Sequence, residues 1–419
     1  MSPASGTAPM TLDPAEAPTV VHAAPKEPIR VLFVSHDSSM FGAQRVLLLL
    51  LSSIDRRVFT PMLLLPFDGP MAHQAAELGI PVFVKRLVHW VPGSAVSTGR
   101  QRIRHLARFL RSLHSRCRAI EQLITEHKVD LVYTNTVTCV EGAIAAQRTR
   151  RPHVWHIHEH ILRNSDLAPL FPYRFHCAVI GFLTRSVIFC SKALASDYPL
   201  LSGKAFVVYN GLPSHPFREK VSSRAEVLRA LGCESDTKLV AVVGALFPNK
   251  DHMTFLAAAE KVARKIGNVA FLIVGSGSES YTNRIRHRIR DLQLDSMVRL
   301  LGWRNDVYDL MAAIDVLVIS SEQESFGLTA IEALSMETPV VATRCGGPEE
   351  VMVDGNTGLL VPVKDPDAMA DAIVKLLKNP ELARGLGIRG REHVLRHFDI
   401  DRFVQRIQGV IKETAACRS

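Results

Sequence analysis

The sequence predicts two successive doubly wound α/β domains, each built on a parallel sheet that helices cover on both faces. Three observations lead to this fold class. Short runs rich in Val, Ile, Leu and Phe alternate with longer helical patterns. Most of these runs are apolar on both faces, as in strands buried between two helix layers. The alternation stops at a polar, proline-containing stretch, residues 212–237, and then starts again.

The first domain is expected to span residues 29–211, after a disordered lead-in over residues 1–28 that is rich in Pro, Ala and Thr. Its first strand, residues 29–35, is followed by a helix over residues 43–54. Its further strands are expected at residues 59–65, 82–84, 131–134, 154–158, 187–190 and 206–209.

The second domain is expected to span residues 238–395, after a linker with a short helix at residues 212–237. Its strands are expected at residues 239–243, 270–274, 298–301, 316–319, 340–342 and 358–361. Its helices are expected at residues 254–266, 281–292, 307–313, 330–335 and 368–377. The segment 396–419 is expected to hold a last helix, residues 398–413, that crosses back to the first domain. Because ligands of such sheets bind beyond the carboxyl ends of the strands, we expect functional residues in the loops that follow strands.

The composition is that of a soluble globular protein, with 47% hydrophobic and 22% charged residues. The formal net charge of +9 indicates either an anionic partner or well-solvated helix faces. Residues 1–28 lack the basic start and apolar run of a signal peptide, and the longest apolar stretches, residues 46–51 and 177–183, are too short to cross a bilayer. We therefore expect a cytoplasmic protein, soluble or peripheral on the inner face of the cytoplasmic membrane.

Seven cysteines are scattered along the chain, and none forms a C-x-x-C pair. Their spacing therefore gives no indication of a zinc site or a redox dithiol. An odd, dispersed set fits a reducing cytosol better than an oxidising compartment.

The segment 324–332 (ESFGLTAIE) follows an expected strand, and its turn at residues 325–328 opens a helix. Backbone N–H groups at a helix N-terminus bind anions, and Gly327 allows a phosphate to approach closely. Glu332 could accept hydrogen bonds from ribose hydroxyls, and Glu324 could accept them from a sugar ring. Two glutamates eight residues apart are usually only solvated, and the turn between them favours the functional interpretation.

The stretch ESFGLTAIEALSMETPVVATRCGGPEEVMVDGNTGLLVP resembles the family 4 retaining glycosyltransferases, and the matches extend along most of residues 30–395. The family's E-x7-E pair, its G-G-x-x-E turn and its G-x-x-G-L-L-V hairpin occur here in order, on Glu324 and Glu332, on Gly346, Gly347 and Glu350, and on Gly355, Gly358, Leu359, Leu360 and Val361. A lone E-x7-E pair is a weak signal, whereas this ordered set is specific. The resemblance implies the GT-B fold, with two Rossmann-like domains facing a central cleft.

The resemblance also implies a nucleotide-sugar donor held mainly by the second domain. The implied contacts around the turn are Ser325, Phe326, Gly327, Leu328 and Glu332. The family motif G-R-L-x-x-x-K, whose Arg and Lys hold the donor diphosphate, corresponds to GALFPNK at residues 244–250. Lys250 matches the motif, whereas Ala245 stands where the arginine is expected. The missing charge must then come from helix ends or from another arginine, for which Arg304 is one possibility.

Four further positions border the donor in the family. Gly275 lies in the loop after the second strand of the second domain, and Trp303 with Arg304 lies near the nucleotide base. Gly42, in the first domain, would approach the donor phosphates from across the cleft. Without the resemblance, Lys250 would be interpreted as a surface lysine, Trp303 as a packing residue and Gly42 as a glycine that eases a turn.

The string HIHEH at residues 156–160 closes an expected strand of the first domain, and alternation places His156 and His158 on one face. The pair could bind a metal, or both side chains could be core residues with satisfied hydrogen bonds. The resemblance favours a third interpretation, in which His158 contacts the reacting sugar, with His156 as second choice. The expected catalytic residues are thus His158, Lys250 and Glu324.

Two D-x-D strings, residues 365–367 and 399–401, recur elsewhere as metal motifs of GT-A transferases. Here Asp365 or Asp367 stands where it can cap a helix, and the other string precedes the last helix. We interpret both as structural, and we expect neither a metal nor any other cofactor.

Residues 100–128 predict a basic amphipathic helix. Its apolar stripe consists of Ile103, Leu106, Leu110, Leu113, Cys117, Ile120 and Ile124. Its arginines lie mostly off this stripe, at positions 100, 102, 104, 108, 111, 116 and 118. The helix either packs on the sheet with a solvated basic face or rests on anionic lipid and brings a lipid-linked acceptor to the enzyme.

The resemblance implies a retaining transfer of a sugar from a UDP- or GDP-sugar to a glycan or lipid-linked acceptor, in polysaccharide or glycolipid synthesis. We expect no nucleic-acid partner. Two alternatives stay open from the residues alone. One is a metal-dependent hydrolase built on His156 and His158. The other is a non-catalytic binder of membrane or anionic polymer that uses the basic helix.

Overall fold

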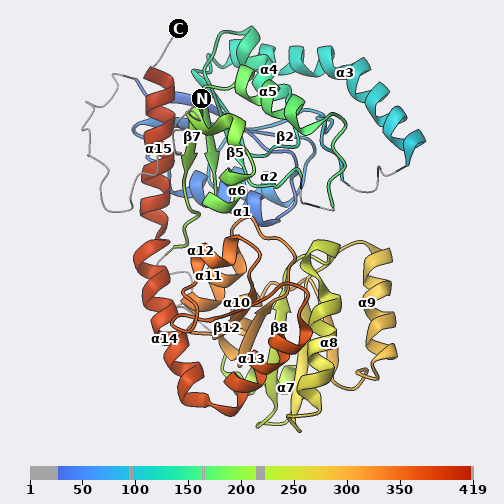
Figure 1. Ribbon diagram of the computed structural model, residues 1–419. Coiled ribbons are helices and arrows are strands. Elements are labelled where there is room, and N and C mark those ends of the chain that lie inside the picture. The colour runs from blue at the N-terminus through green and yellow to red at the C-terminus, as the bar shows by residue number, and fades with distance from the viewer. Residues whose placement is uncertain are drawn as a thin grey trace, which may run out of the picture. The chain divides into compact units, whose positions relative to one another are not determined.

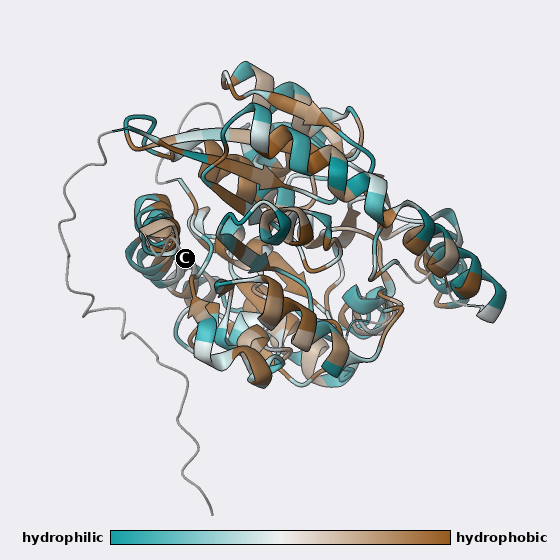
Figure 2. Ribbon diagram, turned by 90° about the horizontal axis from the view of Figure 1, so that it is seen from above, coloured by the Kyte–Doolittle hydropathy of each residue, from teal (hydrophilic) through white to brown (hydrophobic). Residues whose placement is uncertain are grey.

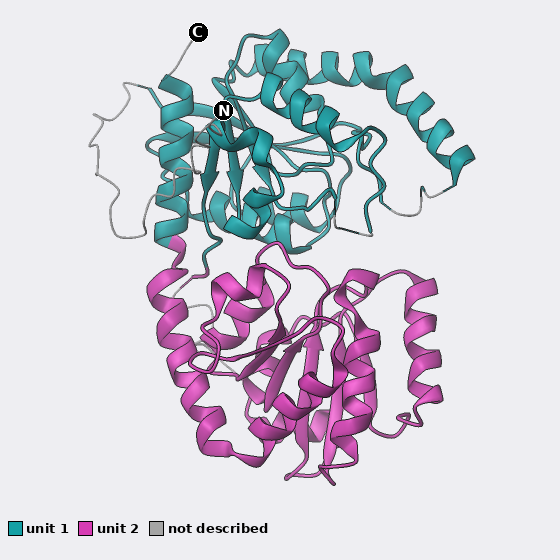
Figure 3. Ribbon diagram, viewed as in Figure 1, with its two compact units in different colours: residues 1–211, 401–419 teal, residues 212–400 magenta. Residues whose placement is uncertain are grey.

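The computed structural model describes residues 27–93, 96, 98–162, 164, 166–213 and 222–416. The chain forms two compact units, one of residues 1–211 with 401–419 and one of residues 212–400 (Figures 1 and 3). Of the predicted lead-in, residues 1–26 lie outside the described part of the chain.

Unit 1 contains a parallel sheet that has seven strands within the described residues, in the order β3-β2-β1-β4-β5-β6-β7. These strands are β1 (Ile29–Val34), β2 (Phe59–Leu65), β3 (Val82–Val84), β4 (Leu131–Thr134), β5 (His153–Ile157), β6 (Ser186–Phe189) and β7 (Ala205–Val207). The helices are α1 (Gly42–Ser53), α2 (Pro70–Glu77), α3 (Gly99–Glu126), α4 (Glu141–Arg148), α5 (Tyr173–Leu183), α6 (Lys192–Ser196), the 3-10 helix η1 (Pro199–Lys204) and α15 (Ile400–Ala416). The chain adds β2 and β3 on one side of β1 and β4 to β7 on the other, so the strand order has a switch point between β1 and β4. Sheets of this kind bind ligands at the switch point.

Unit 2 contains a second parallel sheet, which over the described residues has six strands in the order β10-β9-β8-β11-β12-β13. These strands are β8 (Lys238–Val243), β9 (Val269–Val274), β10 (Val298–Gly302), β11 (Val316–Ile319), β12 (Val340–Thr343) and β13 (Leu359–Val361). The helices are α7 (Arg224–Ala230), the 3-10 helix η2 (Pro248–Lys250), α8 (His252–Ala263), α9 (Glu279–Asp291), α10 (Val307–Ala313), α11 (Leu328–Ser335), α12 (Gly347–Val351), α13 (Pro366–Lys378) and α14 (Pro380–His397). Its switch point lies between β8 and β11.

The strands form because their side chains are apolar on both faces and helices cover both. Every residue of β4, β6, β9, β11 and β12 is buried. In Figure 2 the strands are mainly brown, whereas the helices around them also carry teal residues. The predicted pair of doubly wound α/β domains is confirmed.

The described part of residues 212–237, where a linker with a short helix was predicted, belongs to unit 2 and contains the short helix α7. Helix α7 begins with a capping box between Ser223 and Glu226. Arg224 then anchors it, since its Nη2 donates to Asp315 Oδ2 at 2.7 Å and to the Thr237 carbonyl at 3.0 Å. Residues 214–221 lie outside the described residues.

Helix α15, the last helix of the chain, belongs to unit 1 although the preceding residues belong to unit 2 (Figure 3). It is bound to the first sheet by a 2.7 Å hydrogen bond between the hydroxyls of Thr414 and Ser186. The Asp55 amide donates to Gln408 Oε1 at 3.0 Å. Where the chain passes between the units, Leu212 N–H donates to the Phe398 carbonyl at 2.8 Å. The two passages of the chain are therefore hydrogen-bonded to each other.

The apolar stripe of the basic helix, α3, is only partly buried. Its residues Ile103 and Leu110 are 69% and 55% exposed. Arg116, assigned to the basic set, is buried, because its Nε donates to Glu141 Oε1 at 2.7 Å. The Glu141 carboxylate is itself buried and also accepts the Val88 N–H, so the arginine neutralises it. Within the described residues, no helix is both long and apolar enough to span a bilayer.

Candidate functional site

Lys250 and Glu324 meet at the switch point of unit 2. Lys250 ends η2, which follows β8, and Glu324 lies in the loop after the neighbouring strand β11. The Lys250 Nζ lies 2.5 Å from Glu324 Oε1, and both side chains are partly buried. Ser321 Oγ donates to the same carboxylate oxygen at 2.7 Å, and Ser320 Oγ donates to the Lys250 carbonyl at 2.7 Å. Two adjacent serines therefore fix the ion pair that the sequence predicted only as two separate residues.

The loop that carries Glu324 is held by the glycine pair of the next loop. The Glu324 amide donates to the Cys345 carbonyl at 3.2 Å, and the Gly347 amide donates to the Glu324 carbonyl at 2.9 Å. A Cβ on Gly347 would lie 2.4 Å from the carbonyl carbon of Phe326, which real Cβ atoms do not tolerate. The glycine thus permits the backbone approach that positions the carboxylate.

Gly327 stands immediately before helix α11 and has a φ of 96°, in the left-handed region that favours glycine. The first backbone N–H groups of α11 have no acceptors within the helix, and the helix dipole makes this end partially positive. The predicted anion site therefore has the required backbone conformation, and it lies in the same loop as Glu324.

Two predicted donor contacts are buried. Phe326 is 3% exposed, and its ring centroid lies 5.7 Å from that of Phe398. The aromatic packing removes this side chain from solvent. Glu332 is also 3% exposed, and its Oε1 accepts the Tyr308 hydroxyl at 3.2 Å.

The loops after β9 and β10 carry the remaining predicted positions of unit 2. A Cβ on Gly275 would lie 1.8 Å from the Gly244 carbonyl oxygen, so this glycine is required for the packing of two loops. Trp303 is 64% exposed, which excludes its interpretation as a packing residue. Arg304 pairs with Asp306 through its Nε at 2.7 Å and its Nη2 at 2.5 Å. Its guanidinium is therefore already engaged by a carboxylate.

The carboxyl ends of the unit 1 strands carry His158 and Asn135. His158 Nε2 lies 3.0 Å from Asn135 Oδ1, and Asn135 Nδ2 donates to the Ala43 carbonyl at 3.0 Å. These contacts join the ends of β4 and β5 to the first turn of α1. Gly42 is the first residue of that helix, after the exposed Phe41 at the N-cap.

His156 and His158 lie on one face as predicted, with ring centroids 3.9 Å apart. Burial lowers the pKa of His158 to about 3, with a smaller contribution from His36, and it lowers the pKa of His156 well below the usual range. His156 is fully buried and its Nδ1 lies 2.7 Å from the Tyr133 hydroxyl. Both imidazoles are therefore neutral near pH 7 and act as hydrogen-bonding groups, with His158 the less buried of the two.

Glu159 is a site residue that the sequence reasoning missed. Its carboxylate accepts the Val137 amide at 3.0 Å, the Thr136 hydroxyl at 2.9 Å and the His158 amide at 3.2 Å. Burial raises its pKa, and these hydrogen bonds partly oppose that rise. Glu159 thereby fixes the backbone that presents His158. Its place between two histidines in the string HIHEH was the available signal.

The aspartates of the first D-x-D string have structural contacts. Asp365 caps α13, since its carboxylate accepts the Ala368 amide at 2.9 Å. Asp367 accepts Lys261 Nζ at 2.7 Å. Among the described residues, no group of three or more His, Cys, Asp or Glu side chains is arranged to hold a metal ion.

Residues 223–393 match the family model described as "Glycosyl transferases group 1". This part of the chain is therefore similar to the group 1 glycosyl transferases. The Lys250–Glu324 pair, Gly327 and Glu332 all lie inside the matched residues.

Two curated proteins are similar in sequence to part of this chain. The N-acetyl-alpha-D-glucosaminyl L-malate synthase of Bacillus anthracis is 30% identical over 203 residues, which are 48% of this chain and 52% of that protein. The lipopolysaccharide core biosynthesis glycosyltransferase LpsE of Rhizobium meliloti is 33% identical over 168 residues, which are 40% of this chain and 48% of LpsE. The chain thus spans about half the length of these curated relatives.

Solved structures cover more of the chain. HepE of Anabaena in complex with UDP-glucose gives a TM-score of 0.76 at 23% identity, covering 92% of this chain and all of HepE. WaaG, a glycosyltransferase involved in lipopolysaccharide biosynthesis, gives a TM-score of 0.67 at 17% identity, covering 91% of this chain and 99% of WaaG. The likeness to these solved structures confirms the GT-B fold that the sequence resemblance implied.

Proposed function

We propose that this protein is a retaining glycosyltransferase that moves a sugar from a nucleotide-sugar donor to a glycan or lipid-linked acceptor. The observation that carries the proposal is the 2.5 Å ion pair between Lys250 and Glu324 at the switch point of unit 2. It joins a cation suited to a diphosphate and a carboxylate suited to sugar hydroxyls within one glycosyl transferase region.

The proposed role of Lys250 is to offset the charge that develops on the leaving diphosphate. A preorganised cation and a helix N-terminus stabilise such charge without reorganising during the reaction. Lys250 is held before donor arrives by Glu324, and its carbonyl is held by Ser320. The α11 N-terminus that follows Gly327 would add backbone N–H donors for the phosphate oxygens.

Retention of anomeric configuration is proposed to follow from displacement on one face of the sugar. Glu324 is already paired with Lys250 and Ser321, so it is a poor candidate for a covalent nucleophile and a better contact for sugar hydroxyls. The leaving phosphate would then take the acceptor proton. His158 is neutral and would contribute a hydrogen bond to the transferred sugar rather than a charge.

The names of similar proteins support UDP as the first nucleotide to test. HepE of Anabaena was solved with UDP and with UDP-glucose, and LpsE is a lipopolysaccharide core glycosyltransferase. We propose a donor of the UDP- or GDP-sugar class and a saccharide acceptor. We also propose that the transfer proceeds without a metal, because Lys250 and the α11 N-terminus supply the positive charge.

A lipid-linked acceptor is proposed on the basis of helix α3. The exposed apolar residues Ile103 and Leu110 are seven positions apart, and so are the exposed arginines Arg104 and Arg111. Residues with this spacing share a helix face, which would suit an anionic membrane surface. Sedimentation with phosphatidylglycerol vesicles should therefore weaken in an Ile103→Asp variant. Unchanged sedimentation would remove the membrane from the proposal and leave the glycan acceptor.

The experiment that tests the function is a thermal-shift screen of UDP-, GDP- and ADP-sugars, followed by NMR of the product. A donor at about 100 times its Kd adds roughly 2.7 kcal/mol to the unfolding free energy, which raises the Tm by several degrees. The product should keep the anomeric configuration of the donor, and EDTA should leave the rate unchanged. An inverted product would refute retention, and the absence of binding, hydrolysis and transfer with every donor would refute the proposal as a whole.

A further inference from the structure

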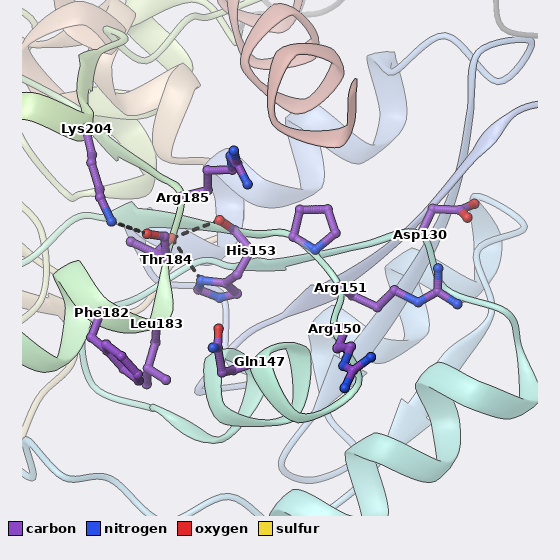
Figure 4. A pocket seen from close by; sticks show the side chains of 11 residues that line it. Asp130, Gln147, Arg150, Arg151, His153, Phe182, Leu183, Thr184, Arg185 and Lys204 are labelled. Carbon is purple, nitrogen blue, oxygen red and sulfur yellow. Dashed lines mark hydrogen bonds between the residues drawn. The ribbon is translucent and has the colours of Figure 1, made fainter. Parts of the chain in front are cut away.

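A cavity of about 560 Å³ lies at the amino-terminal edge of the unit 1 sheet. Figure 4 shows its lining side chains around His153, the first residue of β5. The lining also includes Thr184 and Arg185, just before β6, and Lys204, just before β7. His158 follows the other end of β5, so the cavity and the candidate sugar contact lie at opposite ends of the same strand.

The lining of this cavity is strongly basic. Four cationic side chains, those of Arg150, Arg151, Arg185 and Lys204, line it together with one carboxylate, that of Asp130. Within the described residues, none of the three arginines forms an ion pair with an acidic side chain. The cavity thus carries an excess of positive charge that no part of the described chain offsets.

The one carboxylate does not neutralise this excess. Asp130 is engaged by Arg30, whose Nε donates to Oδ2 at 3.0 Å and whose backbone N–H donates to the same oxygen at 3.0 Å. His153 contributes no charge, because burial lowers its pKa to about 3. Its two ring nitrogens lie 2.8 Å from the Thr134 hydroxyl and 3.0 Å from the Thr184 hydroxyl, so it is a fixed part of the wall.

Lys204 is held in place at this site. Its ammonium donates to the Gly181 carbonyl at 2.5 Å and to the Thr184 carbonyl at 2.9 Å. Because an ammonium has three N–H donors, one remains for a ligand. Beside it, Phe182 is exposed and Leu183 is half-buried, which gives the cavity an apolar rim.

We propose that this cavity is a second ligand site, separate from the donor site, and that it binds a diphosphate group. Guanidinium groups match phosphate oxygens with paired N–H donors, and a ligand with two or three negative charges would offset most of the charge of the four cations. The volume lies within the range of small-molecule sites. The apolar rim formed by Phe182 and Leu183 would contact the organic part of such a ligand.

The site belongs wholly to unit 1, whereas Lys250 and the other donor residues belong to unit 2. Binding at the two sites is therefore separable by mutation. The diphosphate could belong to a soluble metabolite or to a lipid headgroup, since both present the same phosphate oxygens to the arginines.

The test is calorimetric titration of the full chain with inorganic pyrophosphate. An Arg150→Asn/Arg185→Ala variant removes two exposed charges, and asparagine tolerates the positive φ of 54° at position 150. We expect this variant to lose one binding event or to weaken it at least tenfold, and Lys250→Ala to retain that event. Arg174→Ala, which removes an exposed arginine of α5 outside the cavity, is the matched control and should bind as the unmodified chain does.

A parallel measurement with vesicles that contain a polyprenyl diphosphate lipid distinguishes the two sources. If the double variant weakens pyrophosphate binding but not vesicle binding, the ligand is a soluble diphosphate. If it weakens both, the ligand is a lipid headgroup, and the cavity site is again supported. Pyrophosphate binding that is unchanged in the double variant, or that disappears entirely in Lys250→Ala, would overturn the proposal while leaving the donor-site proposal intact.

Discussion

The strand ends of the two units are built for different kinds of ligand. In unit 2, the switch point holds a formal cation and anion, Lys250 and Glu324, beside the N-terminus of α11. In unit 1, the corresponding strand ends hold His156 and His158, which are neutral, and an amide side chain, Asn135. Unit 2 is thus suited to a charged phosphate, and unit 1 to uncharged hydroxyl groups.

This difference follows from how each unit treats its charged groups. Unit 2 keeps its ion pair partly exposed, so a ligand can exchange partners with it at little desolvation cost. At its strand ends, unit 1 instead buries its titratable groups and compensates them with hydrogen bonds, as Glu159 shows with its three donors. In the proposed reaction, unit 2 would bind the charged phosphates and unit 1 the sugar hydroxyls.

The largest effect is expected from Lys250→Ala. Loss of one preorganised group that stabilises transition-state charge typically lowers the rate about 10²- to 10³-fold. The rate of transfer from the best donor measures this. Lys261→Ala is the matched control, because it removes a lysine of unit 2 that pairs with the exposed Asp367. Equal rates in the two variants would mean that the ion pair at the switch point has no part in the reaction.

Gly347→Ala should destabilise unit 2 and displace the donor loop. The new Cβ would clash with the backbone of Phe326, and such overpacking costs about 1–3 kcal/mol. Differential scanning calorimetry should show a lower Tm together with weaker donor binding. Gly267→Ala has open space around its Cβ and should change neither quantity. Full stability of Gly347→Ala would contradict the proposed role of the glycine pair.

His158→Ala should lower kcat about tenfold, the equivalent of one lost hydrogen bond of roughly 1–1.5 kcal/mol. The affinity for UDP should stay the same, because the nucleotide is proposed to be held by unit 2. Steady-state kinetics and calorimetric titration with UDP separate the two effects. A weaker UDP affinity at constant kcat would reverse the proposed division between the units.

Acid should destabilise unit 1 before unit 2. Within the described residues, six histidines of unit 1 and two of unit 2 have a lowered pKa, namely His36, His89, His153, His156, His158 and His176, and His252 and His393. As the pH falls below about 6.5, the unfolded chain takes up protons that the folded chain does not bind, so the unfolding free energy decreases. Hydrogen exchange at pH 5 should be faster than at pH 7 mainly in unit 1, after correction for the intrinsic rate. Equal acceleration in both units would count against this expectation.

The smallest effect is expected from Arg304→Ala. This guanidinium is paired with Asp306, and exposed pairs contribute about 0–1 kcal/mol. Donor affinity should change less than about twofold. A tenfold loss would instead identify Arg304 as the source of the charge that is missing at Ala245.

The fold was largely readable from the sequence because strongly apolar runs marked the strands. The predicted bounds of β11 and α10 agree with the structure at both ends. Helix α14 was missed because Gly385, Gly387 and Gly390 interrupt its pattern. The structure supplies the reason for two of them, since a Cβ on Gly387 would lie 2.0 Å from the Glu337 carbonyl oxygen and one on Gly390 would lie 2.6 Å from Leu334. Close packing of α11 and α14 therefore requires glycine, a residue of low helix propensity that a sequence pattern counts against a helix.

The candidate site was only partly predictable. Motif spacing predicted Lys250 and Glu324 as two separate donor contacts, and the adjacent strands β8 and β11 of the structure bring them together. Burial of Phe326 depends on Phe398, which is 72 positions away, and burial of Arg116 depends on Glu141. Such long-range partners leave no local pattern, so the sequence did not reveal that these two side chains are buried.

The return of α15 to unit 1 makes unit 2 an insertion within unit 1. During synthesis, every residue of unit 2 has been made before the first residue of α15 that belongs to unit 1. Helix α15 buries Phe403, Ile407 and Ile411, so unit 1 lacks part of its apolar surface cover until this helix has been made. Unit 2 can therefore finish folding on the ribosome before helix α15 is available to unit 1. A fragment that ends at residue 400 would contain all of unit 2 but would lack the last helix of unit 1.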